Sequence, residues 1–392
     1  MNLPVPNLKA DLDFPLLIFP YLFSPTHFPL LIFSYSFSLM TFEPVATPLL
    51  PEEWTTLESH QIYHHLNQLT TLATGQGWSV PLPPVTHIPI HIYDTVVSTN
   101  TILWQQIHGS GGHPVKDWQE CTVAIARQQS AGKGQWGRQW QSGLGGLYLS
   151  MALKPRCPVE AAAQITLSGA VGVAIALRRC GLPVLIKWPN DLVVPSSALV
   201  PATLQGEEQI LYKLGGMLTE TRLQGQIISQ AVVGIGINGA NPVPPQGITV
   251  QTVANSLPGD ERATSPRWAA PLMSLNGMGA IAIWGILTGW QRWQQQGIAS
   301  ILVDYNHLLS HRGQWVSFHH HDQISQGHIV GVNPDGNLRV RIGSPPPSTP
   351  VNSTPPPGTL SFLKPSSQEM LLTPGDIRLE YRLSSGYQGS NR

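Results

Sequence analysis

The chain has 392 residues, which is enough for two or three domains of about 150 residues and for a sizeable buried core. Lys plus Arg and Asp plus Glu balance at 22 each, and charged residues make up only 11% of the chain, against about 25% in an average soluble protein. This balance argues against a protein that coats nucleic acid, and we expect no nucleic-acid partner. The three cysteines lack CxxC spacing, which is typical of reduced thiols and indicates a cytoplasmic protein.

The first 42 residues differ in composition from the rest of the chain. Seven of the nine Phe lie between Phe14 and Phe42, and that stretch contains no Asp, Glu, Lys or Arg. It is long enough to span a bilayer at about 20 residues, but its prolines recur every four or five residues and would break a spanning helix. We therefore predict that residues 1–42 are a hydrophobic Phe- and Pro-rich extension outside the fold, and we expect no membrane partner.

Residues 43–90 form a polar segment in which a short helix is expected between Glu53 and Gly77. Strand patterns follow over Cys121–Ala126 and Leu147–Leu153, with a loop of six glycines between them. Apolar residues then recur at helical spacing over Glu160–Cys180, with Arg178 and Arg179 in the last turn. Further strands are expected at Val184–Trp188, Gly216–Arg222 and Ile227–Ile237, and a Trp-bearing helix at about Pro271–Gln296.

The end of the chain has a pattern of short strands. They are expected over Gly327–Val332, Asn337–Ile342 and Asp376–Tyr381, the first two joined by an Asn-Pro-Asp-Gly turn. Between the last two, residues 344–368 are rich in Pro, Ser and Thr, which favours a surface insertion. We predict a mixed α/β domain over 91–312 and a small β-barrel domain over 313–385.

The segment Gln129–Trp140 combines glycines with two cations. Glycines let backbone amides approach a phosphate, and Lys133 and Arg138 can neutralise it. The Gly-Lys-Ser/Thr ending of a Walker A loop is absent. From these residues alone, an anion-binding loop and a surface hairpin turn both remain open.

Three further clusters follow apolar strands. Lys187–Asp191 reads KWPND at a strand end, where α/β sheets usually meet their ligands, and a surface ion pair between Lys187 and Asp191 is the alternative. Lys213–Gly216 reads KLGG, and Gly234–Asn238 reads GIGIN. Glycines there permit close approach of a flat ligand, although each strand alone is equally compatible with a β-bulge.

These motifs, together with Ser98-Thr99-Asn100, resemble the biotin protein ligase family in their order from about residue 90 to 383. The segment GHIVGVNPDGNLRV also resembles that family's SH3-like C-terminal domain, and no DNA-binding winged helix is evident upstream. The resemblance implies a mixed sheet with helices like that of class II aminoacyl-tRNA synthetases. It also implies a reaction in which biotin and MgATP give biotinyl-5′-AMP, which then biotinylates a lysine of the biotin carboxyl carrier protein of acetyl-CoA carboxylase.

The resemblance also implies roles for particular residues. Asp191 would serve Mg²⁺, and the proposed catalytic cations would be Lys213, Lys187, Arg138 and Lys133. Residues implied for ATP are Gly132, Arg138, Lys187, Asn190 and Asn238. Residues implied for biotin are Ser98, Thr99, Asn100, Gln129, Lys133, Gly134, Gln135, Lys213 and Gly216. A helix N-cap role for Ser98 and Thr99 is compatible with this assignment.

Three departures from the family pattern matter, and the Pro-rich insertion over residues 344–368 is one of them. The family loop commonly has arginines where this chain has Lys133 and Gln135, so adenylate retention is expected to be weaker. The family joins KWPND to KLGG by a short turn, whereas Leu192–Tyr212 is longer here and is expected to be a surface excursion. Two rival functions remain: a lipoate or octanoate ligase of the same superfamily, and a non-enzymatic biotin sensor.

Overall fold

The computed structural model describes residues 50–75, 87–109, 118–199, 209–257, 273–320, 323–343, 368–380 and 382–383. The predicted extension over residues 1–42 lies outside this part of the chain, as does nearly all of the predicted insertion over 344–368.

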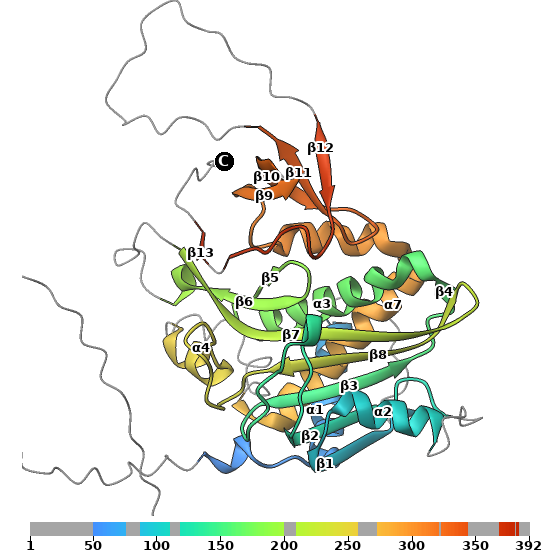
Figure 1. Cartoon of the computed structure of the whole chain (residues 1–392). Coiled ribbons are helices and arrows are strands. Elements are labelled where there is room, and N and C mark those ends of the chain that lie inside the picture. The colour runs from blue at the N-terminus through green and yellow to red at the C-terminus, as the bar shows by residue number, and fades with distance from the viewer. Residues whose placement is uncertain are drawn as a thin grey trace, which may run out of the picture. The chain divides into compact units, whose positions relative to one another are not determined.

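A mixed nine-stranded sheet forms the centre of the fold (Figure 1). Its main order is β1-β2-β3-β8-β7-β6-β5, with β4 paired to β8 and β13 paired to β7. The β1–β2 pair is parallel, and the other pairs are antiparallel. The strands are β1 (Ile90–Val96), β2 (Val123–Gln129), β3 (Leu147–Leu153), β4 (Cys157–Pro158), β5 (Leu185–Lys187), β6 (Asp191–Pro195), β7 (Gln209–Gln224), β8 (Ile227–Ile237) and β13 (Arg382–Leu383).

Helices cover both faces of this sheet because its strands alternate apolar side chains between two cores. Val123 and Ile125 of β2 belong to the larger core, whereas Ala124 between them packs in a second core with Leu103 and Ile107. Helix α2 therefore lies on one face, and α1, α3 and α7 lie on the other. The helices are α1 (Ser59–Gly75), α2 (Thr99–His108), α3 (Ala162–Arg179), α4 (Val250–Ser256) and α7 (Leu275–Leu308).

Helices α3 and α7 meet through small residues, which lets their backbones touch. A Cβ atom on Gly285 would lie 2.6 Å from the Cα of Val173, and one on Gly172 would collide with the Gly285 carbonyl. Among the described helices, the stretch Val159–Arg179 is long and apolar enough to cross a membrane by length and composition. Its buried residues pack in the protein core, which explains its apolar composition without a bilayer.

The structure confirms most of the predicted elements and corrects two. Strands β3 and β8 have the predicted bounds, and α7 extends past the predicted end through a kink at Gly297, where φ is +72°. The prediction of a surface excursion over Leu192–Tyr212 is wrong at its start, because Leu192–Val194 are fully buried in β6 between β5 and β7. Residues 200–208 of that stretch lie outside the described part of the chain. Residues 376–380 contain no strand, and the segment instead passes the site described below.

The expected C-terminal β module is a four-stranded antiparallel sheet of order β12-β11-β10-β9. Two of its strands match predictions, and the Asn333 side chain organises the predicted turn by accepting hydrogen bonds from the amides of Asp335 and Asn337. The indole of Trp188 donates to the Gly336 carbonyl at 2.8 Å, so this turn contacts the KWPND motif. The strands are β9 (Trp315–His320), β10 (Gln323–Val332), β11 (Leu338–Ile342) and β12 (Glu369–Leu372).

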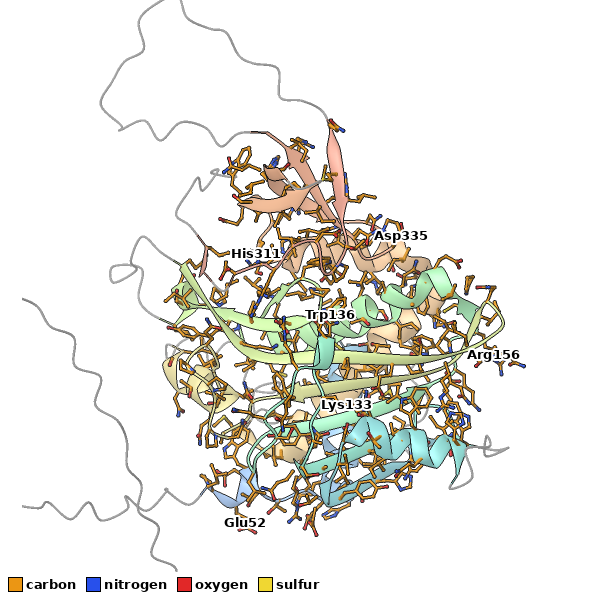
Figure 2. All side chains as sticks on the ribbon, viewed as in Figure 1. Glu52, Lys133, Trp136, Arg156, His311 and Asp335 are labelled. Carbon is orange, nitrogen blue, oxygen red and sulfur yellow. The ribbon has the colours of Figure 1, made fainter. Side chains whose placement is uncertain are left out.

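His311 joins the turn after α7 to the C-terminal segment, and Figure 2 labels it near the small sheet. Its Nε2 lies 3.0 Å from the Glu380 carbonyl and donates to it, because a carbonyl oxygen can only accept. Its Nδ1 then accepts from the Ser310 hydroxyl at 2.9 Å. Burial lowers the pKa of His311 to about 4, and the charge of Lys187 acts in the same direction.

This buried histidine predicts a pH-dependent stability. Between its folded pKa of about 4 and its ordinary value of 6.5, the unfolded chain binds a proton that the folded chain does not. The stabilisation is therefore present above pH 6.5 and is lost as pH falls toward 4, to an extent of about 3 kcal/mol. We expect His311→Gln to lose less stability than the wild type between pH 7 and pH 4.5, as measured by urea unfolding. His60→Gln, which replaces an exposed histidine, should lose as much stability between pH 7 and pH 4.5 as the wild type. Equal losses in all three proteins would refute the role of His311 in this pH dependence.

Candidate functional site

The sheet register brings the sequence motifs together. Lys187 pairs with Asp191 across β5 and β6, and Asp191 pairs with Gly216 across β6 and β7. Gly216 in turn pairs with Gly236 of β8, which pairs with Tyr148 of β3. The KWPND, KLGG and GIGIN motifs therefore form one row across adjacent strands, although as many as 49 positions separate them in the chain.

The glycine-rich loop connects β2 to β3 and folds back on itself. The Trp140 amide donates to the Gly132 carbonyl at 2.9 Å, and the Gly134 amide donates to the Arg138 carbonyl at 2.7 Å. A Cβ atom on Gly132 would lie 2.5 Å from the Trp140 carbonyl oxygen, so this close return requires glycine. At the tip, Trp136 adopts a φ of +60° and is 69% exposed (Figure 2).

A cavity of about 400 Å³ lies between this loop, the motif row and the C-terminal segment. That volume is in the range of small-molecule sites. Asp191 is the one carboxylate among its lining residues. The cations among the lining residues are Lys133, Arg138, Lys187, Lys213 and Arg378. Within the described part of the chain, the lining therefore carries a large excess of positive charge and suits an anionic ligand.

One end of the cavity is polar but uncharged. It is built where β1 ends and α2 begins, and its side chains are those of Ser98, Thr99, Asn100 and Gln129. Ser98 occupies the N-cap position of α2, but its hydroxyl makes no capping bond. The Thr99 backbone amide instead donates to the side-chain oxygen Oε1 of Gln129 at 2.8 Å. The prediction that Ser98 stands at the N-cap of this helix is thus confirmed, but the prediction that its side chain caps the helix is wrong.

The other end is dominated by lysines around Asp191. Lys213 Nζ lies 2.6 Å from Asp191 Oδ1 and 5.2 Å from the centre of the Trp140 ring. Lys187 Nζ lies 3.8 Å from Asp191 Oδ2, and its side chain is 8% exposed. The alternative of a surface ion pair is therefore wrong, because this pair is buried. Burial lowers the pKa of Lys187, the neighbouring cations add to that effect, and Asp191 opposes it.

Most of the predicted site residues line this one cavity, and two do not. Asn238 lies outside the lining, where its side-chain Nδ2 donates to the Lys213 backbone carbonyl at 3.2 Å and so supports the lysine's backbone. Gly132 also lies outside it and permits the return of the loop. Lys133 reaches both the cavity and Glu220 of β7, whose carboxylate is 3.2 Å from its Nζ.

Sequence reasoning assigned no role to several residues that the fold brings to the cavity, among them Trp140 and Arg378. Trp140 lines it, and its buried Nε1 has no hydrogen-bond partner among the described residues. The presence of a tryptophan beside the glycine loop was a usable signal. Arg378 enters from the segment after the Pro-rich stretch, and it carries no motif that would have identified it.

The donor set does not match a metal site held by the protein alone. Magnesium prefers several oxygen ligands, but Asp191 is the single carboxylate among the described residues that line the cavity, and it faces Lys187 and Lys213. Among the described residues, no group of three or more His, Cys, Asp or Glu is placed to hold a metal.

In a comparison with known proteins, residues 94–238 match the biotin/lipoate A/B protein ligase family. A bifunctional ligase/repressor BirA of Bacillus subtilis is 32% identical over 121 residues, which cover 30% of this chain and 33% of that protein. A biotin–[acetyl-CoA-carboxylase] ligase of Paracoccus denitrificans is 32% identical over 117 residues, covering 29% and 42%. The chain thus matches about a third of the length of the first relative and under half of the second.

Among solved structures, the biotin protein ligase of Aquifex aeolicus in complex with biotin and ATP aligns with 64% of this chain and 91% of its own. The TM-score is 0.44 and the sequence identity is 21%. The family match and the curated relatives confirm the family resemblance indicated by the motifs.

Proposed function

We propose that this chain, whose residues 94–238 carry a domain of the biotin/lipoate A/B protein ligase family, is a biotin protein ligase. The observation that carries the proposal is the division of one cavity into a neutral polar end and a cationic end. Biotin has a neutral ureido head and a carboxylate tail, and ATP adds further negative charge. In such a site the ureido head of biotin would bind at Ser98–Asn100, and the biotin carboxylate and the ATP phosphates would bind around Lys213.

In the first step, a biotin carboxylate oxygen forms a bond to the α-phosphorus of ATP. The bond from that phosphorus to the oxygen bridging to the β-phosphate breaks, and pyrophosphate leaves with the electron pair. Two anions must approach each other, so the reaction requires positive charge between them. We propose that Lys213 and Lys187, which both lie beside Asp191, supply this charge, and that Arg138 and Lys133 close over the phosphates. ATP is expected to enter as its Mg²⁺ complex.

In the second step, a lysine amine of an acceptor protein attacks the acyl carbon of biotinyl-5′-AMP. AMP leaves, and the amine loses a proton as the amide forms. The biotin carboxyl carrier protein of acetyl-CoA carboxylase is the acceptor that we propose. No nucleophile on the enzyme is needed, so catalysis rests on positioning and charge neutralisation. We propose that the reaction takes place in the cytoplasm.

The lipoate or octanoate alternative is not favoured. An aliphatic tail offers no acceptor to the buried Nδ2 of Asn100, which has no partner among the described residues, and an unpaired buried polar group costs about 1–3 kcal/mol. A non-enzymatic biotin sensor would have the same polar end, so only an activity measurement separates it from a ligase.

The proposed activity is tested by exchange of labelled pyrophosphate into ATP, with biotin, lipoate or octanoate added separately. We expect exchange with biotin at least about 100-fold above that with the other two acids. A second measurement follows biotin transfer to a purified biotin carboxyl carrier protein. Exchange with lipoate alone would overturn the proposal, and biotin binding with neither exchange nor transfer would favour a sensor.

A further inference from the structure

Ser150 of β3 does not line the cavity, yet its hydroxyl contacts two residues that do. It is fully buried, and its Oγ lies 2.7 Å from Thr99 Oγ1 and 2.6 Å from Asn100 Oδ1. The register places Ser150 opposite Gly234 of β8. A side chain at position 234 would collide with the Asn100 amide, so the glycine leaves the space in which this contact forms.

The chemistry of these three groups determines which of them donates. Asn100 Oδ1 can only accept, so the single hydroxyl hydrogen of Ser150 is directed to it. The 2.7 Å contact with Thr99 then has one available hydrogen, that of the Thr99 hydroxyl. The competing contact from Thr99 Oγ1 to Gln129 Oε1 is longer, at 3.3 Å, and that oxygen already accepts the Thr99 amide.

Two consequences follow for the face that a ligand meets. Thr99 has its hydroxyl hydrogen directed inward, so it presents only lone pairs to the cavity. Asn100 has its carbonyl held by Ser150, so it presents only N–H groups, and its buried Nδ2 has no partner among the described residues. An acceptor therefore stands beside a donor at the polar end.

We propose that Ser150 is a positioning residue that fixes this hydrogen-bond polarity and thereby selects a head group with an N–H beside a carbonyl. A cyclic urea has this arrangement, whereas a dithiolane or an alkyl chain has neither group. In a guanidine-type head, nitrogen replaces the carbonyl oxygen. The ligand then presents an N–H to the N–H group of Asn100, and two donors cannot form a hydrogen bond. This inference rests on the proposed function and extends it to a residue outside the cavity.

The test compares Ser150→Ala with the wild type in the pyrophosphate exchange assay at one pH, using biotin and 2-iminobiotin. In 2-iminobiotin the ureido oxygen is replaced by nitrogen, while the carboxylate tail is unchanged. Without Ser150, the Asn100 amide is free to turn and present either its oxygen or its nitrogen. We expect the KM for biotin to rise about tenfold, kcat to change less than about threefold, and the preference for biotin over 2-iminobiotin to fall about tenfold.

A purely structural role would weaken both substrates equally and leave the preference unchanged, and that result would overturn the proposal. Unchanged KM values in Ser150→Ala would overturn it as well. Ser168→Ala is the matched control, because that buried hydroxyl donates to the Ile165 carbonyl within α3, away from the cavity. This variant should keep the wild-type KM for biotin and the wild-type preference for biotin over 2-iminobiotin. If Ser150→Ala does not fold, Ser150→Cys retains the volume with a weaker donor and should show a smaller shift in the same preference. Absence of biotin-dependent exchange in the wild type would refute the proposed function instead.

Discussion

Replacing Lys213 with alanine is expected to lower biotin-dependent pyrophosphate exchange by about 10²–10³-fold. Lys213 Nζ lies in the cavity, 2.6 Å from Asp191 Oδ1, at the position where we propose that the biotin carboxylate and the α-phosphate approach each other. Without it, Asp191 would add its negative charge to that of the two substrates. The measurement is the exchange rate at saturating biotin and ATP, compared with that of the wild type.

The side chain of Lys213 is 29% exposed, so its loss should leave the fold intact. Thermal unfolding followed by circular dichroism is expected to show a cooperative transition close to that of the wild type. Lys154→Ala is the matched control, because that lysine contacts the Trp118 carbonyl and ring outside the cavity and should keep normal exchange. Wild-type exchange in folded Lys213→Ala would refute the assigned role.

The second large effect is expected in the core, where Gly172→Ala should destabilise the protein by about 3 kcal/mol or prevent folding. The added methyl group would meet the Gly285 backbone carbonyl of α7, and backbone cannot move aside as a flexible side chain can. Helices α3 and α7 would then have to separate along the contact that also includes Gly289. Urea unfolding of the purified variant measures the loss.

Gly75→Ala is the control for this substitution. A Cβ atom on Gly75 would meet no heavy atom within 4 Å, so its stability should stay within about 0.5 kcal/mol of the wild type. If both alanine variants are equally stable, the close approach of α3 and α7 does not limit the packing of the core.

Local sequence patterns predicted much of the secondary structure because those elements are defined by nearby residues. Apolar residues at helical spacing with terminal arginines identified α3, and alternating apolar runs gave β3 and β8 their bounds. Strand β6 was missed because it follows directly on the KWPND turn and looked like the start of a long connection. Its burial depends on β5 and β7, which no local pattern reveals.

The candidate site was likewise predicted in part from the sequence and completed by contacts between distant residues. Residue types and motif order in the sequence alone pointed to a site for a polar, anionic ligand and to the biotin protein ligase family, because such chemistry needs particular glycines, lysines and amides. Only the tertiary structure decided which of those residues share a cavity. The register of antiparallel strands aligned Asp191 with Gly216 and Gly236, whereas it left Asn238 outside the cavity.

Tertiary structure also brought in groups that carry no motif. Arg378 reaches the cavity because the C-terminal segment passes along it, and Ser150 reaches Thr99 and Asn100 because Gly234 opposite it lacks a side chain. The sequence by itself therefore determined the chemistry that is available to this protein and the class of its elements. Contacts between residues distant in the chain decided where that chemistry is assembled, because strand pairing and helix packing, which are non-local, set those distances.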